Sequence, residues 1–140
     1  MSRNVPSSKF RELAQQLLAD EVARDQVAGA NMPPLAHVAE KLRRPLVTLT
    51  GITGFCSLLA RALTLAKAQA PALNILQIEP DGSLIGFDNN KAQIEEAGVM
   101  LLAELLGLLV TFIGERLMLT LVSDAWPDLP IRDDGILEKK

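Results

Sequence analysis

The chain has 140 residues, of which 49% are hydrophobic, 22% are charged and only 4% are aromatic. This length and composition fit one globular domain with a core of Leu and Ala, and they exclude disorder over most of the chain. The formal net charge of −3 and the pI near 5.1 argue against nucleic-acid binding, for which a basic face is expected.

The charges are unevenly distributed. Residues 1–70 carry nine Lys or Arg and five Asp or Glu, whereas residues 71–140 carry five and twelve. The split predicts attraction between the halves, within one chain or between two; a chance distribution of solvated charge is the alternative. The single cysteine, Cys56, cannot form an internal disulfide, and the N-terminal sequence lacks the apolar segment of a signal peptide. We therefore expect a cytoplasmic protein.

Two helices are predicted in the first third of the chain. Apolar residues recur at helical spacing from Ser8 onward, and this helix is expected to end near Gly29. A shorter helix over 35–44 follows. It is predicted to stop before Pro45, because the residue that precedes a proline disfavours the helical conformation.

The segment "TLTGITGF" precedes a third helix. Its threonines and glycines are poor helix formers, so its own conformation stays ambiguous. Thr53 is the best N-cap candidate, and Pro71 closes the helix. The residues predicted to face inward are Phe55, Leu58, Leu59, Ala62, Leu63 and Ala66.

A hairpin and a long helical region are predicted in the second half. Two β-favouring segments, 75–79 and 83–87, flank a Pro-Asp-Gly turn. Two isolated strands are marginal in water, so this hairpin must pack on helices or on another chain. The last helical region covers 93–125, and a polar tail, 127–140, follows it.

The stretch "GVMLLAELLGLLVTFIGERLMLTLV", residues 98–122, contains the strongest signal. As a helix it would carry a narrow polar strip of Glu104, Thr111 and Glu115. A membrane span is disfavoured, because Glu104 lies in its centre. A core helix fits the almost all-round apolarity, and a helix shared between a core and a partner fits better still. The predicted interface comprises Leu101, Leu105, Leu108, Phe112 and a seam of small residues, Ala103, Gly107 and Gly114.

No catalytic signature accompanies this stretch. A nucleophile–base pair of Cys56 and His37 is arithmetically conceivable, but an inert core cysteine is the favoured interpretation. No clustered metal ligands occur, so neither a metal nor another cofactor is predicted. A weak alternative is an anion site at the Thr/Gly turn before the third helix, formed by Thr50, Gly51, Thr53 and Gly54.

The segments "GITGFCSLLARALTLAKAQAPAL", "DGSL" and "AELLGLLVTFIGERL" follow one another over residues 50–122. In this order they resemble a set of small uncharacterised bacterial proteins. The resemblance implies a bacterial, mostly helical domain, and it implies no activity, ligand or catalytic residue.

These observations predict a mainly α protein, a compact bundle of four to five helices with one small β-hairpin. Residues 8–126 would form a single domain between a flexible arm, 1–7, and the mobile tail. The predicted function is a non-enzymatic interaction module that forms a homo-oligomer or docks into a bacterial complex through the apolar C-terminal helix. The alternatives are a membrane-associated protein using 97–122 and 46–66, or a small-ligand regulator at the Thr/Gly turn.

Overall fold

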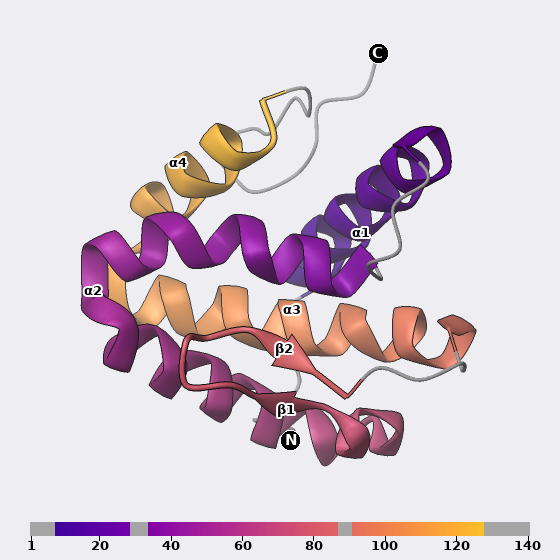
Figure 1. Cartoon of the computed structure of the whole chain (residues 1–140). Helices are drawn as coiled ribbons and strands as arrows, with labels where there is room; N and C mark the ends of the chain where they lie inside the picture. Colours follow the sequence, from indigo (N-terminus) through magenta and orange to yellow (C-terminus); the bar gives the residue numbers. More distant parts are fainter. Residues whose placement is uncertain (1–7, 29–33, 87–90, 128–140) are drawn as a thin grey trace.

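The computed structural model describes residues 8–28, 34–86 and 91–127 (Figure 1). These residues form a mainly helical, compact bundle with one two-stranded antiparallel hairpin, which confirms the predicted fold class. The predicted arm, 1–7, and the predicted tail beyond Pro127 lie outside the described residues. In chain order the elements are α1 (Ser8–Ala28), α2 (Pro34–Lys67), the 3₁₀-helix η1 (Pro71–Ile75), β1 (Gln77–Ile78), β2 (Leu84–Ile85), α3 (Lys91–Ile113) and α4 (Glu115–Ala125).

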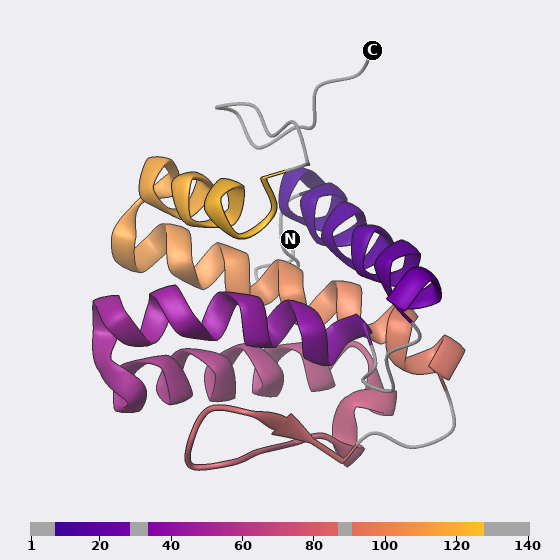
Figure 2. The same ribbon diagram turned by 45° about the horizontal axis from the view of Figure 1, so that its top comes forward.

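Helix α3 forms the centre of the bundle. It packs against α1, α2, α4 and η1, and Figure 2 shows it between α4 and α2. Six successive residues, from Leu101 to Leu106, are buried. Burial on all sides accounts for the nearly continuous apolarity of this sequence. The predicted sharing of the helix between a core and a partner is therefore wrong for its central part.

Helix α2 folds back on itself at Gly51. It consists of two antiparallel legs, 34–50 and 52–67, which lie side by side in Figure 2. Gly51 has φ 82° and ψ 161°, a backbone conformation that is nearly restricted to glycine. The ambiguous Thr/Gly-rich segment is thus a corner between two helical legs.

The first leg of α2 continues through Pro45, so the prediction that the helix stops before this residue is wrong. Leu42 and Leu46, on either side of the proline, are fully buried. Their packing outweighs the local cost of a proline inside a helix. In the second leg the predicted inward face is confirmed, since Phe55, Leu58, Leu59, Ala62, Leu63 and Ala66 are all buried.

The predicted continuous helix over 93–125 is interrupted at Gly114. This glycine has φ 92° and ψ 153°, nearly the conformation of the α2 corner, and it separates α3 from α4. Glu115 consequently belongs to another helix, and the predicted polar strip does not form: Glu104 is buried and Thr111 is exposed. The bend of α2 at Gly51 and the bend between α3 and α4 at Gly114, which we call the glycine corners, lie at the same end of the bundle (Figures 1 and 2).

A buried polar network joins three helices at the C-terminal end of α4. Glu21 of α1 is only 3% exposed. Its Oε2 atom accepts hydrogen bonds from Lys41 Nζ at 2.5 Å and from Trp126 Nε1 at 2.9 Å. The Lys41 amine also lies 5.3 Å from the centre of the Trp126 ring. The network anchors the end of α4 to α1 and to the first leg of α2.

The predicted hairpin is confirmed, with shorter strands than expected. In its turn the Ser83 backbone N–H donates to Asp81 Oδ1 at 2.9 Å, and this bond lowers the pKa of Asp81. Gly82 lies so close to Phe55 of α2 that an added Cβ would stand 2.9 Å from its ring. Together with the burial of Leu84, this contact packs the hairpin on the second leg of α2. Gln77 pairs with Ile85, and Ile78 pairs with Leu84.

Candidate interaction surface at the glycine corners

The predicted interface residues divide between the core and one end of the bundle. Leu101, Ala103 and Leu105 are fully buried within the chain. They have no surface to offer a second molecule in this fold, so the prediction is corrected for these three. The backbone at Gly107 faces Phe10 of α1, whose ring would stand 3.8 Å from an added Cβ. This part of the small-residue seam therefore packs against α1 of the same chain.

The end of α3 is different. Leu108 is half-buried, whereas Phe112 is 66% exposed, and Gly114 lies exposed at the corner. In its C-terminal half, helix α3 thus emerges from the core in its last turn. Of the predicted interface residues, Phe112 offers the largest exposed apolar side chain.

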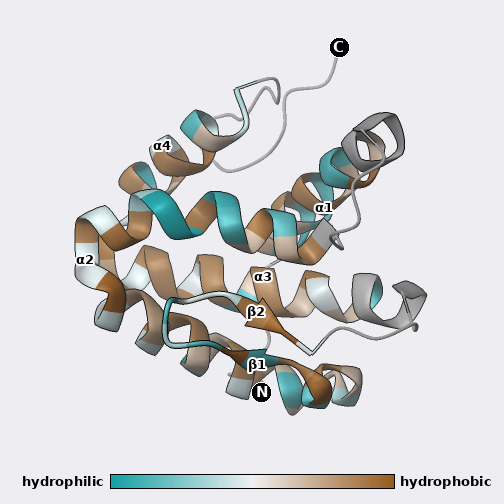
Figure 3. Cartoon of the chain, viewed as in Figure 1, coloured by the Kyte–Doolittle hydropathy of each residue, from teal (hydrophilic) through white to brown (hydrophobic). Residues whose placement is uncertain are grey.

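Phe112 is one of four exposed large apolar side chains that lie at or within a few residues of the two corners, and we call this end of the bundle the corner surface. Two sequence segments without charged residues, 45–60 and 105–114, run through the corners. Figure 3 shows the bend of α2 in white and brown, without the teal of the charged residues before it. The large apolar side chains of the corner surface are Leu49, Ile52, Phe112 and Leu117, with exposed fractions of 48%, 38%, 66% and 38%.

An apolar pocket of about 290 Å³ opens next to Phe112. Its wall is formed by the second leg of α2, by Thr50 before the corner and by the Phe112 ring. Arg61 brings the one charged side chain to this wall. The pocket residues are Thr50, Gly54, Ser57, Leu58, Arg61 and Phe112.

Four threonine hydroxyls in the helices that meet at the corners are satisfied within their own helices. Each donates a hydrogen bond to the carbonyl oxygen four residues earlier and leaves its methyl group as the apolar part of the side chain. These hydroxyls can be taken out of water without losing a hydrogen bond. The bonds run from Thr48 to Arg44, Thr50 to Leu46, Thr111 to Gly107 and Thr120 to Arg116, with oxygen–oxygen distances of 2.8 to 3.2 Å.

The predicted anion site coincides with the α2 corner, but its groups do not converge. The Thr50 hydroxyl donates to the carbonyl oxygens of Leu46 and Gly51, so it is already engaged with its own backbone. An added Cβ on Gly54 would stand 2.9 Å from the Thr50 side chain, which covers that position. Thr53 is exposed. The anion site stays a prediction, with little in this geometry to support it.

The conceivable pair of His37 and Cys56 is not assembled. His37 lies fourteen residues before the corner of α2, and Cys56 lies five residues after it. At 1.5 Å per residue, the two are offset by about 13 Å along the antiparallel legs. The Cys56 thiol instead faces the Pro80 carbonyl oxygen of the hairpin, at 3.6 Å. In the described part of the chain, no three His, Cys, Asp or Glu side chains are grouped as metal ligands.

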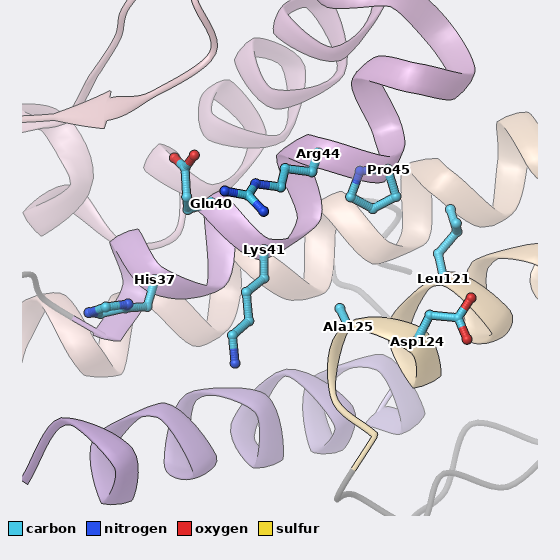
Figure 4. Close-up of a pocket in the computed structure, with 8 residues that line it drawn as sticks. All are labelled: His37, Glu40, Lys41, Arg44, Pro45, Leu121, Asp124 and Ala125. Carbon is cyan, nitrogen blue, oxygen red and sulfur yellow. The ribbon is translucent and has the colours of Figure 1, made fainter. Parts of the chain in front are cut away.

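Sequence reasoning did not find a polar groove of about 460 Å³ between the first leg of α2 and α4 (Figure 4). No pattern in either helix points to it, because its two sides are about eighty residues apart in the sequence. Lys41 points toward α1, where it pairs with Glu21, and Glu40 pairs with Arg43. The groove therefore mixes both signs of charge without a convergent set of donors. It is lined by His37, Glu40, Lys41, Arg44, Pro45, Leu121, Asp124 and Ala125.

With this geometry in hand, the chain was compared with protein-family models, with curated proteins and with solved structures, and none of them matches it. The resemblance to small bacterial helical proteins accordingly stays a prediction. Any functional proposal rests on the residues themselves.

Proposed function

We propose that this protein is a non-enzymatic interaction module that docks through the corner surface. The observation that carries the proposal is the 66% exposure of Phe112 beside an apolar pocket, within two segments free of charged residues. Large exposed apolar groups that cluster in this way mark contact sites on soluble proteins. The depletion of charge is also typical of the buried centre of an interface.

The polar groups around the corners support a contact from which water is excluded. Four threonine hydroxyls are satisfied internally, so covering them leaves no donor unpaired. The two buried carboxylates are engaged in structural contacts, Glu21 with Lys41 and Trp126, and Glu104 with Gln69. This distribution favours a binding role over a catalytic one, in the cytoplasm or in a complex there.

A membrane-associated role is the second candidate, and it draws on one specific observation. The helices Leu35–Lys67 and Glu96–Ile113 are long and apolar enough to cross a membrane by length and composition alone. Half of the Glu96–Ile113 window is buried within the bundle, however, as in the core helix of a soluble protein. We therefore favour binding of a protein partner over association with a membrane.

Photo-crosslinking in cells tests the proposal without assuming a partner. The photoreactive residue p-benzoylphenylalanine replaces Phe112 in one variant and Ile85 in a matched control. Ile85 is 39% exposed and belongs to β2, away from the corners (Figure 1). We expect adducts larger than the monomer from position 112 and few or none from position 85. Equal yields at the two positions, or no adduct at 112, would refute docking through the corner surface.

A further inference from the structure

We propose that the molecule seated on the corner surface is a second copy of this chain. A twofold axis would place each Phe112 ring in the apolar pocket of the other chain. The inference rests on the proposed function and names its partner. Three features of the corner surface lead to it: a projecting ring beside a pocket, the amount of apolar area, and the distribution of charge.

The first feature is the presence of a projecting ring and a receiving pocket on the same surface. Phe112 itself forms part of the wall of the 290 Å³ pocket. Cavities of about 150 Å³ admit benzene, so this pocket has room for a phenyl ring. When a projection and a cavity are neighbours, a single twofold rotation satisfies both at once and closes the assembly at two chains. An unrelated partner would need to supply both a ring and a pocket in matching positions.

The second feature is the apolar area. The four large side chains of the corner surface are on average about half exposed, which corresponds to roughly 400 Å² if each has about 200 Å² when free. A standard interface buries about 800 Å² on each partner, of which somewhat more than half is apolar. The exposed apolar area of the corner surface is thus close to the apolar area that one partner of a stable dimer buries. The threonines near the corners would form the rim of the interface.

The third feature is charge. The segments 45–60 and 105–114 themselves bring no charge to a twofold contact, and the charged residues that directly follow them, Arg61, Glu115 and Arg116, are of both signs. Arg61, at the pocket wall, can lie against the face of an incoming Phe112 ring as a cation–π pair. A lipid surface fits less well, because the net charge of −3 opposes attraction to anionic headgroups. The single Trp, which could anchor at a bilayer interface, is fully buried.

Sedimentation velocity on the full chain, without detergent and from about 1 to about 200 µM, tests the inference. We expect a reversible monomer–dimer equilibrium. Phe112→Ser should weaken it at least about tenfold, because a central aromatic anchor is lost. Ile85→Ser removes a less exposed apolar side chain, 39% against 66% for Phe112, from the hairpin and should leave the equilibrium unchanged. A wild-type monomer throughout the range, or a dimer indifferent to Phe112→Ser, would overturn the proposal.

A pair of charge variants tests the proposed geometry directly. Phe112→Arg alone and Ser57→Glu alone should each dimerise at least about tenfold more weakly than wild type, since each places a charge in an apolar contact. Mixed together, they should form a heterodimer, because the new arginine meets the new glutamate in one contact, and the other contact is changed only by the arginine at the wall of its pocket. Failure of the mixture to associate would exclude this arrangement of ring and pocket.

Docking through the corner surface and dimerisation through it are refuted by different results. If the purified protein is a monomer but position 112 still crosslinks to another protein in cells, the dimer proposal is wrong and the proposed interaction module is supported. If the monomer instead binds vesicles of phosphatidylglycerol and phosphatidylcholine and loses this binding on Phe112→Ser, the corner surface contacts lipid. This result would also overturn the dimer proposal. Absence of crosslinks from position 112 would refute both docking and dimerisation.

Discussion

The carboxyl group of Glu104 lies in the core, with the residue only 8% exposed, and accepts a hydrogen bond from Gln69 Nε2 at 3.1 Å. Burial disfavours the charged form and raises the pKa of Glu104 above its ordinary value of 4.5, while the Gln69 hydrogen bond acts in the opposite direction. The folded state therefore holds this proton more tightly than the unfolded state. Its contribution to stability is complete below the unfolded pKa and declines as the pH rises to the folded pKa.

Glu104→Gln removes this titration and keeps a partner for Gln69. We expect the free energy of unfolding at pH 7 to rise by roughly 1 kcal/mol, because no charge remains to be desolvated. The difference from wild type should vanish at pH 4 and below, where the carboxyl is protonated in both states. Urea unfolding at several pH values measures it, with the exposed Glu96→Gln on the same helix as control. A loss of stability at pH 7 would show that the charged form is favoured in the core.

Glu21 is a buried carboxylate with two hydrogen-bond donors. Its Oε2 atom accepts from Lys41 Nζ and Trp126 Nε1. Glu21→Gln weakens the first contact and disturbs the second, so we expect unfolding to become easier by about 1–3 kcal/mol. The matched change Glu12→Gln, at an exposed position of the same helix, should have almost no effect. The fluorescence of Trp126, the single Trp, follows unfolding in both variants, and equal stabilities would argue against a structural role for the network.

At the scale of elements, the two glycine corners decide the architecture. Each turns the chain back with one residue at positive φ, and no heavy atom lies within 4 Å of an added Cβ at either position. Substitution therefore tests the backbone conformation without a steric clash. We expect Gly51→Ala and Gly114→Ala each to lower the free energy of unfolding by about 1–3 kcal/mol. Gly107→Ala, inside α3 and in ordinary contact with Phe10, should be neutral or stabilising by up to about 1 kcal/mol. Thermal unfolding measures the three variants. A Gly107→Ala variant that is no more stable than Gly51→Ala or Gly114→Ala would contradict this assignment.

The same elements show how far local sequence patterns reach. The apolar periodicity after Thr53 identified the buried face of the second leg of α2, and the Pro-Asp-Gly turn identified the hairpin, because both patterns act over a few residues. The continuation of the first leg through Pro45 was not predictable in this way. It depends on the burial of Leu42 and Leu46 against distant helices, which no local rule reports.

For the whole molecule, the sequence identified the apolar stretch of α3 but not which part of it faces solvent. That division arises because α1, α2 and α4 cover its centre and leave Phe112 at the end. The contact between Glu21 and Trp126 spans 105 residues, and the corner surface joins segments about sixty residues apart. Periodicity defines the faces of single helices, whereas such sites depend on how the faces are packed together. The approach of Phe112 to Thr50 and Gly54 around one pocket accordingly lay beyond local patterns.

The burial of α3 also predicts how the protein behaves without lipid. Transfer of α3 to a bilayer would remove Leu101 to Leu106 from the core, expose the apolar faces of α1 and α2 to water and carry the Glu104 carboxyl into hydrocarbon. The other long apolar helix is divided by the corner at Gly51, and its legs already pack against each other. We therefore expect a protein that stays soluble and free of aggregates in detergent-free buffer, and whose far-UV circular dichroism and Trp126 emission do not change when a nonionic detergent is added above its micelle concentration. A requirement for detergent during purification, or a shift of the emission on its addition, would mean that the bundle opens in an apolar phase and that α3 belongs to a membrane.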